Sequence, residues 1–167
     1  MRNLVLTGFM GTGKSTVGRL AADRLGLIFV DTDVVIAAEV GGSIADIFAR
    51  HGEAEFRRIE AEVCIRAARE SGQVIATGGG ALLSPQVRAA LADGGLLVCL
   101  TCHLDEIIRR VGMGSERPLF AAERDTLARL LAARAAMYAS IPHQVNTTSL
   151  SPAQAAEEVI RLWQQHI

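Results

Sequence analysis

One segment near the N-terminus constrains this chain more than any other. Residues 8–15 read Gly-Phe-Met-Gly-Thr-Gly-Lys-Ser, which fits the pattern G-x-x-x-x-G-K-[ST]. An apolar run over 3–7 precedes the pattern and an amphipathic stretch over 14–25 follows it, so it joins an expected strand to an expected helix. In such a loop, glycines let backbone N–H groups surround phosphate oxygens, and the helix N-terminus adds positive charge. The pattern therefore predicts a nucleoside triphosphate site built from Gly11, Thr12, Gly13, Lys14, Ser15 and Thr16.

Lys14 is the only lysine among 17 basic residues, and the other basic residues are all arginine. An ammonium acts as a compact point charge, which a planar guanidinium replaces poorly between phosphates. The exception therefore falls where arginine would not serve. Ser15 is the expected Mg²⁺ ligand. A guanine-specific N-K-x-D segment would need a second lysine, which this chain lacks.

Short apolar runs alternate with longer amphipathic stretches along the rest of the chain. We expect strands at 3–7, 28–30, 73–76, 96–101 and 144–147. We expect helices at 14–25, 34–40, 44–50, 53–69, 85–92, 104–111, 125–138 and 152–165. This alternation predicts a three-layer α/β fold with a parallel sheet covered on both faces. A length of 167 residues favours a single domain, 1–167, and the glycine-rich segment 112–115 is interpreted as a mobile loop within it.

Composition excludes several classes of partner. The 17 basic and 18 acidic residues give a net charge of −1, without the basic excess of a general nucleic-acid binder. No apolar run approaches the roughly 18 residues that cross a bilayer, and no signal peptide is visible, so we expect a cytoplasmic protein. The three cysteines, Cys64, Cys99 and Cys102, are interpreted as small core thiols. The C-x-x-C-H pattern over 99–103 is not taken as haem attachment, because it begins in an apolar run expected to be a buried strand.

Two further strands end in residues suited to a ligand site. Asp31 and Asp33 follow the second strand, where a carboxylate serves as a Mg²⁺ ligand, as a base for an attacking hydroxyl, or as a helix N-cap. Gly78, Gly79 and Gly80 follow the third strand, where a ligand can approach the backbone closely. The carboxyl edge of a parallel sheet is the usual place for such sites.

Several arginines have two readings on local grounds. Arg57 with Glu60 and Arg58 with Glu62 have the spacing of surface salt bridges on a helix. Arg134 could be a solvated helix residue, and Arg117 an ordinary exposed arginine. Local patterns alone favour these structural readings over a role in binding.

Taken together, these segments resemble the shikimate kinase family. The similarity runs from the first strand to the last helix. It rests on the phosphate loop, Asp31-Thr32-Asp33, Gly52-Glu53 with Phe56-Arg57 and Glu60, Thr77-Gly78-Gly79-Gly80, Arg117-Pro118-Leu119, and Arg134 with Tyr138. The resemblance implies a fold like that of the nucleoside monophosphate kinases, with five parallel strands, a substrate subdomain near 33–60 and a lid near 112–123.

The resemblance also implies roles for single residues. Asp33 would contact the acceptor hydroxyl and Asp31 would lie near Mg²⁺. Arg57 and Arg134 would hold the substrate carboxylate, helped by backbone groups of Gly79 and Gly80. Lys14 and Arg117 would act on the phosphates, and Arg109 would lie against adenine.

The implied reaction is transfer of the γ-phosphoryl group of ATP to the 3-hydroxyl of shikimate, on the route to chorismate and the aromatic amino acids. Mg²⁺ would be the cofactor, and the chain would act as a monomer. Two alternatives stay open from the sequence. One is a kinase for a nucleotide or another polyhydroxy acid such as gluconate, and the other is a non-catalytic nucleotide-binding module.

Overall fold

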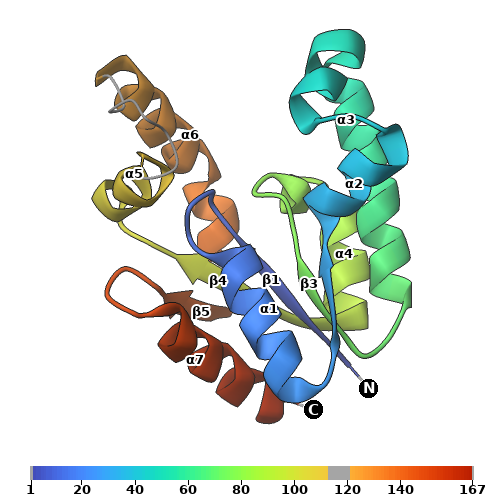
Figure 1. The fold of residues 1–167 in the computed structure, drawn as a ribbon, viewed down its shortest axis with the longest axis vertical. Helices are drawn as coiled ribbons and strands as arrows, with labels where there is room; N and C mark the ends of the chain where they lie inside the picture. Colours follow the sequence, from blue (N-terminus) through green and yellow to red (C-terminus); the bar gives the residue numbers. More distant parts are fainter. Residues whose placement is uncertain (1, 113–120, 167) are drawn as a thin grey trace.

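The computed structural model describes residues 2–112 and 121–166 (Figure 1). Its strands are β1 (Asn3–Gly8), β2 (Ile28–Asp31), β3 (Gln73–Ala76), β4 (Gly95–Thr101) and β5 (His143–Asn146). Its helices are α1 (Lys14–Leu25), α2 (Thr32–Val40), α3 (Ile44–Arg69), α4 (Pro85–Gly94), α5 (Leu104–Gly112), α6 (Ala121–Ala139) and α7 (Pro152–Gln164), with the short 3-10 helix η1 at Ala81–Leu83. Arg117 and most of the lid expected over 112–123 lie outside the described residues.

The strands form one parallel sheet in the order β2-β3-β1-β4-β5, which confirms the predicted fold class. β1 lies at the centre, with Leu6 opposite Ala76 of β3 on one side and Val98 of β4 on the other. Every residue of β1 is buried, as expected for a strand covered on both faces. The loops that follow β1, β2 and β3 therefore leave the same edge of the sheet side by side.

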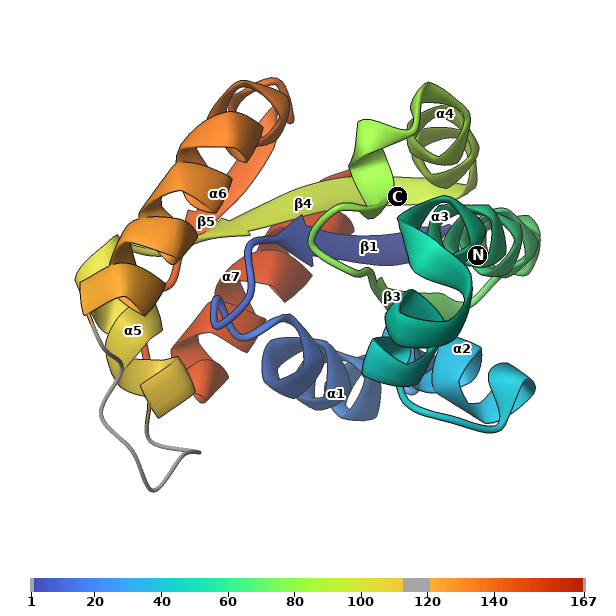
Figure 2. The same ribbon diagram turned by 90° about the horizontal axis from the view of Figure 1, so that it is seen from above.

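The alternation of side chains along β1 separates two cores. Leu4 and Leu6 belong to a cluster that includes residues of α1 and α7. Val5 points to the opposite face and belongs to a cluster with residues of α3 and α4. Figure 2 shows the resulting three layers, with α1 and α7 on one side of the sheet and α3 and α4 on the other.

Helix α3 is bent where the sequence predicts a break. Two helices were expected, over 44–50 and 53–69, and the structure has one run that is non-helical at Gly52, with φ 81° and ψ 175°. A φ in this region favours glycine, because a side chain there would be strained. The first part of α3 begins with Ser43 as N-cap, which forms a capping box with Asp46. A small core of Ile36, Ile47, Phe56 and Val63 packs α2 against both parts of α3.

Cys64 and Cys99 are buried and Cys102 is half-buried, and none of the three forms a disulfide. The first two belong to the core cluster on the α3 and α4 face, which agrees with their interpretation as core thiols. In the part of the chain that the structure describes, no helix has both the length and the apolar character to span a membrane.

Candidate active site

The loop between β1 and α1 curls around the ammonium group of its own lysine. Gly11 and Gly13 have φ values of 73° and 97°, in the left-handed region. Lys14 Nζ donates a 2.9 Å hydrogen bond to the carbonyl oxygen of Phe9, which also accepts from Thr12 Oγ1 at 2.8 Å. Burial lowers the pKa of Lys14 to about 8, although Asp33 and Asp31 oppose the shift. Removal from water thus outweighs the two nearby carboxylates in its effect on the pKa of Lys14.

Ser15 and Asp31 meet at the mouth of this loop. Ser15 Oγ donates to Asp31 Oδ2 at 2.6 Å, and Asp31 Oδ1 accepts from the backbone N–H of Asp33 at 3.1 Å. Asp31 is therefore the N-cap of α2, which begins at Thr32 and not at 34 as predicted. Of the three uses considered for this segment, the structure shows the helix N-cap, which Asp31 Oδ1 provides, while Asp31 Oδ2 accepts from Ser15.

These two side chains fit a Mg²⁺ ion. Mg²⁺ prefers oxygen ligands and is commonly held by one or two protein groups together with phosphate oxygens and waters. Within residues 2–112 and 121–166 there is no cluster of three or more His, Cys, Asp or Glu side chains arranged for a metal. The hydroxyl–carboxylate pair of Ser15 and Asp31 suits an ion that arrives with a nucleotide better than one bound by protein groups alone.

Asp33 and Glu60 approach the backbone after β3. A Cβ atom placed on Gly78 would lie 2.6 Å from Glu60 Oε1 and 2.9 Å from Asp33 Oδ1, so a side chain at this position would displace these carboxyls. Partial removal from water and the neighbouring Asp31 raise the pKa of Asp33, while Lys14 and Arg57 oppose that shift. Asp33 therefore lies close to both the phosphate loop and the glycine segment 77–80.

Arg57 and Glu60 form an inward-facing pair. Arg57 Nη1 lies 2.5 Å from Glu60 Oε2, and Glu60 is only 3% exposed. Burial raises the pKa of Glu60, against the opposing effect of Arg57. A Cβ atom on Gly80 would lie 2.7 Å from both terminal nitrogens of Arg57. The salt bridge that local spacing favours does form, but it is not a surface pair, because Glu60 is buried where α3 packs against the glycine segment.

The neighbouring Arg58 shows the contrast. Its guanidinium is exposed and pairs with Glu55 and Glu62, at 2.7 and 2.6 Å. Here the predicted surface salt bridge with Glu62 is confirmed. Adjacent arginines on one helix therefore have different environments, which the i,i+3 and i,i+4 spacings do not distinguish.

Arg134 reaches the same glycine segment from the opposite side, on α6. A Cβ atom on Gly79 would lie 3.2 Å from Arg134 Nη1, and the Arg134 guanidinium carbon lies 5.9 Å from the centre of the Phe9 ring. Tyr138, one helical turn further on, donates from its hydroxyl to the carbonyl oxygen of Gly79 at 2.6 Å. The two arginines predicted for the acceptor thus converge on Gly79 and Gly80 from different helices.

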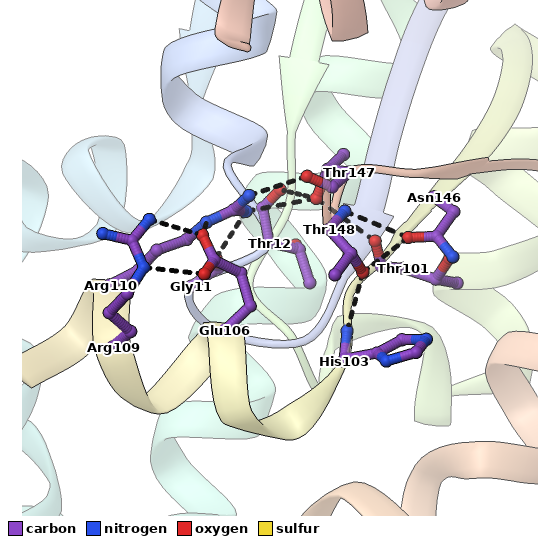
Figure 3. A network of polar contacts seen from close by, with 10 residues as sticks. All are labelled: Gly11, Thr12, Thr101, His103, Glu106, Arg109, Arg110, Asn146, Thr147 and Thr148. Atoms are coloured by element: carbon purple, nitrogen blue, oxygen red, sulfur yellow. Dashed lines mark hydrogen bonds and ion pairs between the residues drawn. The ribbon is translucent and has the colours of Figure 1, made fainter. Parts of the chain in front are cut away.

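A cavity of about 700 Å³ lies beside the phosphate loop. It is lined by residues of the loop, α5, α7 and the segment between β5 and α7: Gly11, Thr12, Gly13, Thr16, Val17, Glu106, Arg109, Arg110, Thr147, Thr148, Ser149, Leu150, Ser151, Pro152 and Ala155. Figure 3 shows the polar contacts beside it. Arg109 lies on the cavity wall and pairs with Glu106 at 2.6 Å.

Sequence reasoning missed several residues of this cavity, above all Arg110 and Thr147. Arg110 donates to the carbonyl oxygens of Gly11 and Thr147, at 3.2 and 2.7 Å. Thr147 comes directly after β5, so the rule that ligands bind at the carboxyl edge of a parallel sheet could have pointed to it. No local pattern distinguishes Arg110 from Arg109.

Comparisons of the sequence and of the structure with known proteins agree on one family. A family model described as shikimate kinase matches residues 10–164. The chain belongs to the shikimate kinase family. A shikimate kinase of Geobacter metallireducens is 43% identical over 161 residues, covering 95% of this chain and 90% of the relative.

Solved structures agree with this membership. A shikimate kinase from Acinetobacter baumannii in complex with shikimate superposes with a TM-score of 0.90 at 31% identity, covering 99% of this chain and 94% of that one. A gluconokinase from Sinorhizobium meliloti has a TM-score of 0.62 at 17% identity, covering 98% and 94% of the two chains. That second likeness shows a shared fold and does not favour gluconate over shikimate as acceptor.

Proposed function

We propose that this chain transfers the γ-phosphoryl group of ATP to the 3-hydroxyl of shikimate, giving shikimate 3-phosphate. The observation that carries the proposal is the convergence of Arg57 and Arg134 on the backbone of Gly79 and Gly80, beside a phosphate-binding loop. Guanidinium groups recognise a carboxylate by paired hydrogen bonds, so a small ring acid fits between them. Residues 33–60 would form the acceptor-binding part of the molecule.

Asp33 would act on the attacking hydroxyl. Its carboxyl lies between the phosphate loop, with which it interacts through Lys14, and the glycine segment at Gly78. A substrate whose carboxylate is held by the two arginines would present its hydroxyls toward this region. Asp33 would accept or orient the hydroxyl proton, which is the task of an aspartate in phosphoryl transfer.

The phosphate loop would position the triphosphate and balance its charge. Lys14 would leave its contact with Phe9 to bind the β- and γ-phosphates, where anionic partners favour its charged form. Ser15 and Asp31 would hold Mg²⁺, which when bound neutralises charge on the phosphates. Phosphoryl transfer depends mainly on such positioning and electrostatic stabilisation.

The base of the nucleotide would occupy the cavity beside Arg109 and Arg110. The cavity begins at Gly11–Gly13 and extends to Pro152, so a nucleotide could keep its phosphates in the loop and its base here. Arg109 remains a candidate for the base, and Arg110 is a second one on the same helix. Arg117 stays a proposed phosphate ligand on the grounds of the sequence.

A coupled assay of ADP release tests the proposal against its alternatives. Purified protein is given Mg–ATP with shikimate, with gluconate, or with nucleoside monophosphates. We expect turnover with shikimate only. Faster turnover of another acceptor would show that shikimate is not the preferred substrate. Nucleotide binding without turnover of any acceptor would indicate a non-catalytic module. From the sequence and its family resemblance we also propose a cytoplasmic monomer. Size-exclusion chromatography with light scattering tests the oligomeric state.

A further inference from the structure

The side-chain hydroxyl of Thr147 lies within hydrogen-bond distance of three groups, the carbonyl oxygens of Thr12 and Thr101 and the guanidinium of Arg110. Thr147 comes directly after β5 and is 2% exposed. Its hydroxyl lies between the phosphate loop and helix α5 (Figure 3). Thr147 Oγ1 is 2.9 Å from the carbonyl oxygen of Thr12 and 3.2 Å from Arg110 Nη1. A buried hydroxyl with two such partners has its proton position fixed by them, since the guanidinium can only donate.

The hydroxyl proton therefore points to Thr12. The carbonyl oxygen of Thr101 is also within reach, at 3.2 Å, but it already accepts from the backbone N–H of Thr147 at 2.8 Å. Thr147 Oγ1 accepts from Arg110 and donates to the shorter contact, the carbonyl of Thr12. The same arginine donates to the carbonyl of Gly11. Two successive carbonyls of the phosphate loop are thus held by one pair of side chains.

Holding these carbonyls fixes the direction of the N–H groups that follow them. The described residues contain no cis peptide bond, and in a trans peptide the N–H points opposite to the C=O of the same unit. The carbonyl of Thr12 is drawn toward Thr147, so the N–H of Gly13 is directed to the other side. Gly13 has a φ of 97° and precedes α1, and such N–H groups at a helix N-terminus bind phosphate.

From this geometry we infer that Thr147 is a positioning residue for the phosphate loop, acting together with Arg110. The inference rests on the proposed function, because it assigns a role at the nucleotide site. Thr147 touches the loop through its carbonyl side, so it contributes to affinity for phosphate without binding phosphate itself. It also connects the loop to α5, because Arg110 is a residue of that helix, where it pairs with Glu106 at 2.8 Å.

The test uses two substitutions with opposite expectations. Thr147→Val keeps the shape of the side chain and removes the hydroxyl, and Thr147→Ser keeps the hydroxyl. We expect Thr147→Val to raise the KM for ATP about tenfold, with the KM for shikimate within about twofold of wild type, because a buried carbonyl loses its donor. Thr147→Ser should remain within about threefold of wild type for both substrates. Thr101→Val is the matched control, because Thr101 enters the network through its backbone carbonyl.

Competition binding separates a phosphate effect from a base effect. Magnesium tripolyphosphate occupies only the phosphate site, whereas ATP also uses the base cavity. We expect Thr147→Val to weaken ATP and tripolyphosphate by the same factor, about tenfold. Equal affinity of wild type and Thr147→Val for tripolyphosphate would overturn the inference, and so would a loss confined to ATP, which would make Thr147 a base-cavity residue.

Two further results complete the test. A thermal unfolding curve for each variant shows whether it is folded at the assay temperature, and if Thr147→Val is not, the comparison of Thr147→Ser with Thr147→Ala replaces it. Equal KM values for ATP in Thr147→Ser and Thr147→Ala would then overturn the inference. If wild-type protein bound neither ATP nor tripolyphosphate, the proposed function itself would fail, whereas an active wild type with an unaffected Thr147→Val would refute the positioning role alone.

Discussion

The hydroxyl of Tyr138 donates a 2.6 Å hydrogen bond to the carbonyl oxygen of Gly79. Tyr138 is 6% exposed and lies one helical turn after Arg134, so a single face of α6 carries both an arginine and the group that holds the glycine segment. The guanidinium of Arg134 opposes the upward shift that burial causes in the pKa of Tyr138, which indicates that the two side chains interact. The contact fixes the Gly79 peptide at the place where Arg134 and Arg57 converge.

Tyr138→Phe should therefore weaken acceptor binding selectively. The ring keeps its packing in the core, while the Gly79 carbonyl loses a buried donor, a change worth roughly 1–2 kcal/mol. We expect the KM for shikimate to rise about 5- to 30-fold and the KM for ATP to change by less than about twofold. Steady-state kinetics with each substrate varied in turn measures both. An unchanged KM for shikimate would mean that the glycine segment holds its conformation without Tyr138.

Arg57→Ala and Arg134→Ala should each impair use of the acceptor much more than binding of ATP. A charge-assisted hydrogen bond is worth roughly 1.5–3 kcal/mol, so we expect a loss in kcat/KM for shikimate of about 10- to 150-fold for each variant. Arg58→Ala is the matched control, since Arg58 is the exposed neighbour with partners of its own. Equal losses in Arg57→Ala and Arg58→Ala would remove Arg57 from the site.

The two arginine variants should differ in stability. Arg57→Ala leaves the buried carboxyl of Glu60 without the partner that lies 2.5 Å away, and a buried group that loses its partner is costly. Arg134 has no such buried acidic partner at ion-pair distance among the described residues. We therefore expect a lower midpoint of thermal unfolding for Arg57→Ala than for Arg134→Ala. Restoration of that midpoint in Arg57→Ala/Glu60→Gln would attribute the difference to the unpaired carboxylate.

Much of the fold follows from local patterns, because strand alternation and helix caps act over a few residues. The ends of α1 and β3 agree with the predicted ranges, and the N-terminus of α7 lies at the predicted residue, where Ser151 and Gln154 form a capping box. The direction in which a side chain points at the site does not follow from such local patterns. Arg57 and Arg58 have similar acidic neighbours in sequence, and only the packing of α3 against the glycine segment turns one of them inward.

The phosphate loop was predictable because its chemistry is contained in eight consecutive residues. Contacts between distant segments were not predictable from the sequence, because they depend on the order of the strands in the sheet. Thr147 meets Thr12 because β1, β4 and β5 are neighbouring parallel strands, so that the segments that follow β1 and β5 lie at the same edge of the sheet. Arg57 and Arg134 became candidates through family resemblance, and the structure brings them together at Gly79 and Gly80, while their roles in acceptor binding stay predictions.

Asp33→Asn should lower kcat by at least about 100-fold while leaving ATP affinity nearly intact. The substitution keeps the size of the side chain and removes the charge that would accept the hydroxyl proton. Undiminished kcat would limit Asp33 to a structural role in α2. Loss of ATP binding would assign it to the metal instead.

The pH profile gives an independent test of Asp33. Its pKa is raised by partial removal from water and by Asp31, so the carboxylate is lost at a higher pH than for an ordinary aspartate. Because the proposed role needs the carboxylate, kcat/KM for shikimate should fall as pH decreases through this raised pKa. The residual activity of Asp33→Asn should lack that acidic limb. An identical limb in the variant would assign the titration to another group, such as Glu60, whose pKa is also raised by burial.

Lys14 offers the most direct test of the phosphate loop, because the chain has no other lysine. Burial lowers its pKa to about 8, so near pH 8 about half of the free enzyme carries the neutral, reactive amine. The ammonium form is lost as pH rises, and kcat/KM for ATP should therefore fall above about pH 8. Bound phosphates favour the charged form, so the alkaline limb of kcat at saturating ATP should lie at higher pH.

Labelling with an amine-reactive reagent connects this titration to the loop. Without nucleotide, mass spectrometry should show modification of Lys14, with activity lost in step. Mg–ATP should protect Lys14, both by covering it and by keeping it charged, while shikimate alone should protect little. The α-amino group of the chain is the internal control, since Mg–ATP should not change its labelling. Lys14→Arg should be severely impaired, because a planar guanidinium does not replace a point charge in a tight backbone loop. Equal labelling with and without Mg–ATP, or full activity of Lys14→Arg, would show that the triphosphate does not bind where the loop pattern predicts.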